Sequence, residues 1–339
     1  MDKKELASVA RALVARGKGI LAADESSGTI KKRLASIDLE STEENRQVYR
    51  DLLFTSPGVE EYISGVILFD ETIRQQALDG RPFPRVLSGR GIMPGIKVDK
   101  GTVPLPGAPA EKLTEGLDGL RARLEEYRGL GARFTKWRAV ITIGEGIPSR
   151  NCIDANAQAL ALYAAYCQEA DLVPIVEPEV LMDGDHSIER CAAVTRATLE
   201  SVFQHLSRAG VLLEGMLLKP NMVISGKGNE RQAGVQEVAE ATVRTLLRAV
   251  PAAVPGIVFL SGGQSPEQAT EHLSAMNRLG RFPWELSFSY GRALQENSLK
   301  AWRGEPRNVP QAQQIFAERS RLNSLARSGE YSREMETAR

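Results

Sequence analysis

The chain has 339 residues, and 43 Lys and Arg residues balance 43 Asp and Glu residues, so its formal net charge is zero. This balance provides no global positive field for nucleic acid and no basic tail for an anionic membrane. No apolar run approaches the ~18 residues that cross a membrane, and the charged N-terminal stretch lacks the apolar core of a signal peptide.

Three cysteines, Cys152, Cys167 and Cys191, have an odd count and no CxxC spacing. This usage is typical of reduced thiols rather than of a disulfide framework. We therefore expect a cytoplasmic protein that binds small molecules and neither nucleic acid nor membranes.

Eight short apolar runs alternate with helical patterns along the chain. We predict strands at 19–24, 63–69, 93–98, 134–141, 172–177, 215–219, 256–260 and 286–290. Helical patterns cover 155–170, 187–209, 230–250, 266–278 and 311–326, with Ser187 and Ser265 in N-cap positions. The Pro/Gly-rich segment 101–111 is interpreted as a loop at a strand end, and about 328–339 as a mobile C-terminal tail.

The alternation of strands and helices indicates parallel pairing, because parallel neighbours need crossover connections. Eight strands are the number that closes a (β/α)8 barrel. An open doubly wound sheet is the alternative, but no Gly-x-Gly-x-x-Gly opens a helix after the first strand and no mid-chain linker is visible. We predict an α/β fold: a (β/α)8 TIM barrel formed by a single domain over residues 1–339.

Polar and charged residues lie at or near the carboxyl ends of the predicted strands, and in a barrel these ends converge on one mouth. In chain order these residues are Asp24, Lys97, Lys136, Arg138, Glu177, Glu179, Lys219, Ser261 and Arg292. Charge at the ends of apolar strands is scarce where packing alone selects residues. The pattern therefore predicts a catalytic mouth. Only the second strand, which ends at Phe69-Asp70-Glu71-Thr72, offers less obvious chemistry.

Lys219 follows the apolar run Met216-Leu217-Leu218. Partial burial disfavours the ammonium form of a lysine, and a neutral amine is a nucleophile towards ketones and aldehydes. Lys219 is therefore a candidate Schiff-base lysine, and repulsion from a cationic Lys136 would help to keep it deprotonated. The alternative is a snorkelling lysine whose stem covers apolar surface.

The cations at the strand ends would repel one another unless the ligand is anionic. Ser261-Gly262-Gly263-Gln264-Ser265 precedes a helix N-terminus, and Ser289-Tyr290-Gly291-Arg292 follows the last strand; in barrels these two loops often bind phosphate. The alternative for the glycine pair is an ordinary tight turn. A second anion site is predicted where Asp24–Thr29 precedes Lys31, Lys32 and Arg33, with a capped helix start as the alternative.

Glu177 and Glu179 provide two carboxylates near one strand end, where Pro178 is expected to stiffen a turn. Carboxylates beside lysines transfer protons or form ion pairs; we expect catalysis from Glu177 and slightly favour structural pairing for Glu179. The turn Asp183-Gly184-Asp185-His186 could hold a cation, but no HxxxH or HxH pair exists. We expect a turn and helix cap there, and no metal or other cofactor.

Seven short motifs occur in an order that resembles the class I fructose-bisphosphate aldolases. They are Leu21-Ala22-Ala23-Asp24-Glu25-Ser26, Gly95-Ile96-Lys97-Val98-Asp99-Lys100-Gly101, Lys136-Trp137-Arg138, Val176-Glu177-Pro178-Glu179, Leu218-Lys219-Pro220-Asn221-Met222, Leu260-Ser261-Gly262-Gly263-Gln264 and Phe288-Ser289-Tyr290-Gly291-Arg292-Ala293-Leu294. The resemblance implies a (β/α)8 barrel, a homotetramer, sugar-phosphate substrates and no metal cofactor.

The resemblance also implies roles for individual residues. Lys219 would form the Schiff base, Glu177 would be a principal acid/base, and Asp24 and Lys136 would assist carbinolamine formation and carbon–carbon cleavage. The ketone-side phosphate would be bound by Ser261, Gly262, Gly263, Ser289, Gly291 and Arg292. The other phosphate would be bound by Ser26, Arg33 and Lys97.

One departure from the family concerns proton transfer on the enamine. Eukaryotic members usually have a longer tail that ends in tyrosine and helps this step, whereas the last tyrosine here is Tyr331. The resemblance leaves the group that protonates the enamine unassigned. The alternative functions are another imine-forming aldolase or transaldolase, or a catalytically silent barrel that binds sugar phosphates or a protein partner.

Overall fold

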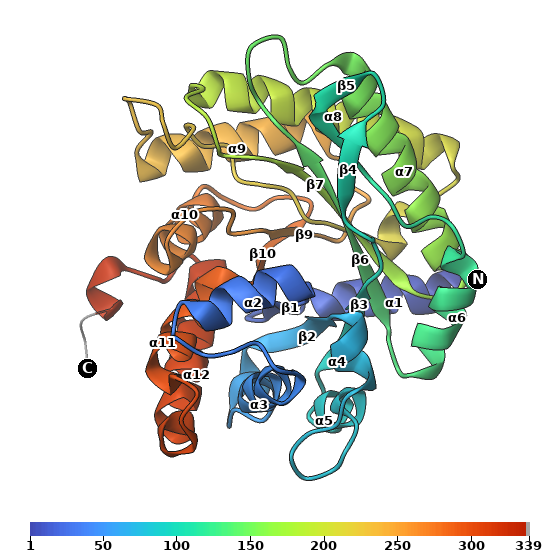
Figure 1. Cartoon of the computed structure of the whole chain (residues 1–339). Coiled ribbons are helices and arrows are strands. Elements are labelled where there is room, and N and C mark those ends of the chain that lie inside the picture. Colours follow the sequence, from blue (N-terminus) through green and yellow to red (C-terminus); the bar gives the residue numbers. More distant parts are fainter. Residues whose placement is uncertain (337–339) are drawn as a thin grey trace.

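Eight parallel strands close into a barrel in the computed structural model, which describes residues 1–336 (Figure 1). The strands are β1 (Gly19–Ala23), β2 (Ile63–Leu68), β3 (Met93–Lys97), β6 (Phe134–Ile141), β7 (Val173–Val180), β8 (Leu217–Leu218), β9 (Gly256–Phe259) and β10 (Glu285–Tyr290). β10 closes the barrel by pairing with β1, with Ile20 opposite Ser289. The predicted (β/α)8 barrel is confirmed.

The chain also forms helices, most of which follow strands and make up the outer layer around the barrel (Figure 1), whereas α1 precedes the first strand. They are α1 (Lys3–Leu13), α2 (Ser27–Ala35), α3 (Glu43–Phe54), α4 (Asp70–Arg74), α5 (Phe83–Gly89), α6 (Leu120–Gly129), α7 (Arg150–Glu169), α8 (Ile188–Arg208), α9 (Val235–Ala249), α10 (Pro266–Arg278), α11 (Arg292–Trp302) and α12 (Val309–Arg327). The predicted N-caps are confirmed, because the Ser187 hydroxyl accepts from the Arg190 N–H and the Ser265 hydroxyl from the Gln268 N–H. No helix within residues 1–336 is long and apolar enough to cross a membrane.

The segment predicted as a loop at 101–111 is instead part of a β-hairpin, so that interpretation was wrong. β4 (Thr102–Leu105) and β5 (Ala108–Thr114) pair antiparallel, and Gly107 in the turn has a φ of 79°. Pro104 lies within β4, which a two-stranded ribbon tolerates because one side of each strand has no partner. No regular alternation of apolar and polar residues marks 108–114 as a strand.

β7 continues past Glu177 to Val180, so Pro178 lies inside a strand rather than in a turn. The strand tolerates this proline because pairing with β8 ends at Val176, opposite Leu218. A proline has no N–H to donate, and here no strand needs one. β8 is also shorter than predicted, although the Lys219 N–H still donates to the Val176 carbonyl at 2.8 Å.

α1 fills the end of the barrel at which the strands begin. Leu6, Val9 and Leu13 of α1 join one buried apolar cluster with barrel residues such as Phe134 and Ile175. Glycine is required where the helix approaches most closely, because a Cβ on Gly256 would lie 2.5 Å from the Val14 side chain. In Figure 1, α1 crosses behind the strands.

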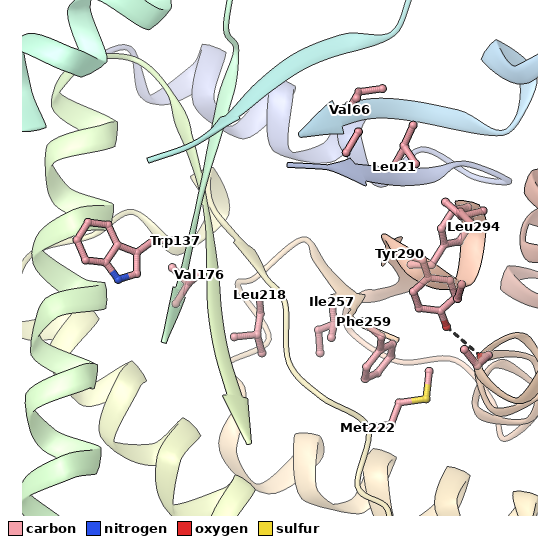
Figure 2. Close-up of a cluster of buried hydrophobic side chains, with 14 of the residues drawn as sticks. Leu21, Val66, Trp137, Val176, Leu218, Met222, Ile257, Phe259, Tyr290 and Leu294 are labelled. Atoms are coloured by element: carbon pink, nitrogen blue, oxygen red, sulfur yellow. Dashed lines mark hydrogen bonds between the residues drawn. The ribbon is translucent and has the colours of Figure 1, made fainter. Parts of the chain in front are cut away.

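A second, larger apolar cluster lies between the outer face of the barrel and the helices. Figure 2 shows members of this cluster from seven strands and from α11. Leu21, Val66, Val176 and Leu218 are each no more than 1% exposed. Burial of each such side chain contributes about 1.5–3 kcal/mol to folding, so this layer holds the strands in register beneath the functional residues.

The segment after α12 packs against α10 and α12. The Tyr331 side chain is 1% exposed, and its carbonyl accepts hydrogen bonds from Arg278 (2.7 Å) and Ser274 (3.2 Å). Arg319 forms an ion pair with Glu336, and this contact ties the segment to α12. Mobility of the predicted tail over 328–339 stays a prediction, and residues 337–339 lie outside the described residues.

Candidate active site

Side-chain alternation along the strands directs the predicted catalytic residues into the barrel. Ile175 and Leu217 belong to the interior apolar cluster, and two residues further along the same strand faces stand Glu177 and Lys219. Lys136 has the same relation to Phe134. Because residues i and i+2 share one face of a strand, the charged groups form the layer directly above the apolar interior.

This layer forms the bottom of a cavity of about 1080 Å³ at the carboxyl ends of the strands. The cavity lining contains the predicted site residues Asp24, Ser26, Arg33, Lys97, Lys136, Arg138, Glu177, Glu179, Lys219, Ser261, Gly262, Ser289, Gly291 and Arg292. Gly263 is not part of the lining. Its N–H points to the Met182 sulfur at 2.8 Å, and a Cβ on it would lie 2.4 Å from that sulfur.

Two lysines and two carboxylates alternate in a chain of close contacts at the bottom of the cavity. Lys219 Nζ lies 3.2 Å from Glu177 Oε1, and Glu177 Oε2 lies 3.2 Å from Lys136 Nζ. Lys136 Nζ lies 2.7 Å from Asp24 Oδ2. Glu177 therefore bridges the two lysines, and Lys136 bridges the two carboxylates.

Burial alone would raise the pKa of Asp24, but the nearby ammonium groups of Lys136, Lys219 and Lys97 outweigh it and lower that pKa well below its usual range. For Lys136, burial acts to lower the pKa, but Asp24, Glu177 and Asp99 outweigh it and the pKa is raised. Asp24 is therefore an anion and Lys136 a cation throughout the physiological range.

Asp99 connects the cavity cations on one side, and the sequence analysis did not select it. Its Oδ1 lies 2.5 Å from Lys97 Nζ, and its Oδ2 accepts from the Arg138 N–H at 3.2 Å. The Arg138 guanidinium bonds to Glu179 Oε2 at 2.5 Å, so Glu179 has a structural ion pair. The available signal for Asp99 was its position two residues after Lys97.

One group of polar atoms gathers where β9 and β10 end. The Arg292 guanidinium donates to the Gly262 carbonyl at 3.0 Å. The Ser289 hydroxyl is buried, lines the cavity and has no hydrogen-bond partner among residues 1–336. A Cβ on Gly291 would lie 3.3 Å from the Ala22 carbonyl and 3.4 Å from the Arg33 guanidinium, so this position is close-packed. A guanidinium, a free hydroxyl and glycine backbone together suit a phosphate.

The second predicted anion site lies at the start of α2, directly after β1, the strand that pairs with β10. Ser26 is the N-cap residue, but its hydroxyl makes no cap hydrogen bond and lies 3.3 Å from the Thr29 hydroxyl. Arg33 forms an ion pair with the buried Glu25. Glu25 also bonds to Arg50 at 2.5 Å and to Gln295 at 3.0 Å. The sequence analysis missed the contribution of this cluster, because its members are far apart along the chain.

The family model described as fructose-bisphosphate aldolase class-I matches residues 5–339 of the sequence. The chain belongs to the class I fructose-bisphosphate aldolase family.

Relatives within this aldolase family match nearly the full chain. A protein of Xanthomonas campestris named probable fructose-bisphosphate aldolase class 1 is 61% identical over 98% of this chain and 99% of its own length. Cytosolic fructose-bisphosphate aldolase 5 of Arabidopsis thaliana is 56% identical over 96% of this chain and 91% of its own. A crystal structure of the Plasmodium falciparum aldolase, determined in complex with TRAP and an inhibitor, has a TM-score of 0.96 and 53% identity, and the match covers 97% of this chain and 96% of that one.

Within residues 1–336, no group of three or more His, Cys, Asp or Glu side chains is arranged to hold a metal ion. His186 is 8% exposed, and burial lowers its pKa. Both of its ring nitrogens lack a hydrogen-bond partner among the described residues. That this aldolase works without a metal or other cofactor stays a prediction.

Proposed function

We propose that the chain reversibly cleaves fructose 1,6-bisphosphate to dihydroxyacetone phosphate and glyceraldehyde 3-phosphate through a Schiff base on Lys219. The observation that carries this proposal is the buried Lys219–Glu177–Lys136–Asp24 chain of charges at the bottom of the cavity. Such an arrangement provides a nucleophilic amine, a carboxylate within reach of it and a cation to hold that carboxylate in place.

In the first stage, the neutral amine of Lys219 attacks C2 of the open-chain ketose. Glu177 Oε1 lies 3.2 Å from Nζ, close enough to move the protons that convert the carbinolamine to an iminium and water. The ammonium group of Lys136 lies 3.2 Å from the other oxygen of the same carboxylate, Glu177 Oε2.

In the second stage, the iminium accepts the electron pair released when the C3–C4 bond breaks. A carboxylate must take the proton of the C4 hydroxyl. The lowered pKa of Asp24 makes it a weak base, so Glu177 is the better candidate and Asp24 holds Lys136. Glyceraldehyde 3-phosphate then leaves, the enamine is protonated, and hydrolysis releases dihydroxyacetone phosphate.

The two phosphates of the substrate would occupy the two groups of polar residues described above. Ser261, Gly262, Ser289, Gly291 and Arg292 suit the ketone-side phosphate, and the unpartnered Ser289 hydroxyl supports this assignment. The candidate groups for the second phosphate are Ser26 and Arg33 at α2, together with Lys97 at the end of β3. Gly263 was predicted for the first of these sites, but its N–H faces Met182 instead.

Reduction with borohydride in the presence of fructose 1,6-bisphosphate tests the proposal. The reagent should trap the substrate carbons on the protein, and peptide mass spectrometry should map the adduct to Lys219. Lys219→Ala should remove both the adduct and turnover, and turnover of wild type should survive EDTA. A fully active wild-type protein with an unmodified Lys219 after reduction would refute the mechanism.

We also propose that the protein is a cytoplasmic homotetramer, as the resemblance to the family implies. The cytoplasmic assignment is supported by the Arabidopsis relative that is named cytosolic. Sedimentation of the purified protein at about four times the chain mass of 37.0 kDa is the expected result; a stable monomer or dimer would contradict the tetramer.

A further inference from the structure

Two buried polar side chains lie directly behind the loop that follows β9. Gln264 ends this loop and His272 lies two turns into α10, and each is 4% exposed. His272 Nδ1 is 2.5 Å from Gln264 Oε1. The Gln264 Nε2 group lies 3.1 Å from the Ser261 carbonyl and 3.5 Å from the Met222 sulfur. The proposed mechanism uses neither His272 nor Gln264.

The chemistry of these groups allows one hydrogen-bond direction. The Ser261 carbonyl only accepts, so the Gln264 amide must present its NH₂ to it and its oxygen to the imidazole. That oxygen also only accepts, so His272 must carry its proton on Nδ1. Burial lowers the pKa of His272 to about 4, and the ring is therefore neutral and in this tautomer at neutral pH.

The fixed Ser261 carbonyl determines where the next N–H points. The carbonyl accepts two hydrogen bonds from the protein side, from the Gln264 backbone N–H at 3.1 Å and from its side chain. In a planar trans peptide the C=O and the following N–H point in opposite directions. The Gly262 N–H is thereby directed away from Gln264, and Gly262 is part of the cavity lining.

The next peptide, Gly262–Gly263, is also planar but is oriented the other way. The Gly262 carbonyl faces Arg292 on the cavity side, and the Gly263 N–H consequently faces Met182 behind the loop. The Gly262 N–H is therefore available to a ligand in the cavity, whereas the Gly263 N–H points to Met182. This alternation depends on the orientation of the Ser261–Gly262 peptide.

We propose that His272 is a positioning residue for phosphate binding: through the Gln264 side chain it holds the Ser261–Gly262 peptide with the Gly262 N–H directed at the ketone-side phosphate. The inference rests on the proposed function of this wall of the cavity. We call the hydrogen-bonded series His272–Gln264–Ser261 the relay. His272 lies on α10 and does not itself line the cavity.

Two nearly isosteric substitutions remove the relay at different points. His272→Phe keeps a ring but has no Nδ1–H, and Gln264→Met keeps the length of the side chain but has no amide. Thr270→Val is the matched control, because Thr270 is also buried on α10 and bonds to the Pro266 carbonyl and to Asn323 but not to the loop.

The first readout is binding of inorganic phosphate to the purified proteins by calorimetry, which does not require turnover. We expect each relay variant to raise the phosphate Kd about 5- to 10-fold, and Thr270→Val to leave it within 2-fold. The double variant should bind phosphate no more weakly than the weaker-binding single variant, because both substitutions break the same relay. Wild type that binds no phosphate, relay variants that keep the wild-type Kd, or effects that multiply in the double variant would each overturn the inference.

The second readout is steady-state cleavage of fructose 1,6-bisphosphate. The relay variants should raise KM by a similar factor and keep kcat within about 2-fold, whereas a general loss of structure would lower kcat as well. Absence of wild-type turnover would contradict the proposed function, and a changed phosphate Kd would still be observed if the relay is real. Circular dichroism verifies that each variant is folded. If one relay variant fails to fold, the phosphate Kd and the KM of the other variant test the inference.

Discussion

Glu177 lies 3.2 Å from the side-chain nitrogen of each of two buried lysines, and this position determines what its replacement does. Its two oxygens face different lysines, so the side chain cannot rotate without losing one contact. The same carboxylate therefore orders Lys136 and Lys219 and remains within reach of the reacting nitrogen. Its catalytic and its orienting contributions arise from one group.

Glu177→Gln should lower kcat for fructose 1,6-bisphosphate cleavage by about 10²- to 10⁴-fold, because the amide cannot accept a proton. KM should change by less than about 5-fold, since the phosphate-binding groups are untouched. Steady-state kinetics measures both constants. Retention of wild-type kcat would remove Glu177 from the mechanism.

Arg292→Ala should weaken substrate binding, because the guanidinium is the charged donor at the end of β10 and bonds to the Gly262 carbonyl at 3.0 Å. A charged hydrogen bond contributes about 1.5–3 kcal/mol, which corresponds to an increase in KM of about 10- to 100-fold. Arg307→Ala, on the exposed turn before α12, is the control and should keep the wild-type KM. An unchanged KM in Arg292→Ala would contradict the phosphate role.

At the scale of elements, the β4–β5 hairpin is connected to α7 through one buried carboxylate. Glu111 of β5 is 3% exposed and accepts from both the N–H and the hydroxyl of Ser149, each at 2.6 Å. Ser149 is in turn the N-cap of α7, and its hydroxyl accepts from the Cys152 N–H at 3.1 Å. Hairpin and helix start are therefore mutually stabilising.

Glu111→Ala should lower the free energy of unfolding by about 1–3 kcal/mol, because two partly buried donors of Ser149 lose their acceptor. Urea unfolding monitored by circular dichroism measures the loss. Glu115→Ala, at an exposed position just beyond β5, is the control and should stay within about 0.5 kcal/mol of wild type. Equal stability of the two variants would show that the contact contributes nothing.

The eight barrel strands and most of the site could be predicted because apolar runs and the residues after them are local signals. Lys219 became a candidate through the apolar run Met216–Leu218, and the polar residues at the other strand ends favoured its catalytic role over a snorkelling one. The hairpin was missed because 101–111 is rich in proline and glycine and β5 has no regular apolar/polar alternation. Glu25 was not selected because Arg50 and Gln295 reach it from distant helices. Gly263 was placed with Gly262 because composition does not reveal the direction of a peptide plane.

At the scale of the whole molecule, His272 makes the stability of the fold depend on acidity. Burial lowers its pKa from 6.5 to about 4 in the folded state, so below pH 6.5 the unfolded chain binds a proton that the folded chain does not. Protonation therefore favours unfolding as the pH falls from about 6.5 towards 4, and the ring has no such effect above that range.

The unfolding free energy of wild type relative to His272→Phe should therefore fall by about 3 kcal/mol between pH 7 and pH 4, since one pKa unit corresponds to 1.36 kcal/mol. Phenylalanine does not titrate, and the other groups titrate alike in both proteins and cancel in the difference. Urea unfolding at a series of pH values measures this difference. A difference that stays constant over the range would show that His272 does not have a lowered pKa.

The packing of α1 into the lower end of the barrel has a kinetic consequence. Leu6, Val9 and Leu13 fill that end. Among residues 1–336, the active-site cavity is therefore open only above the charged layer. Substrates, products and the water released on imine formation therefore pass through the same opening. In the synthetic direction we expect the ketone to enter before the aldehyde, because the ketone reacts with Lys219 at the bottom of the cavity.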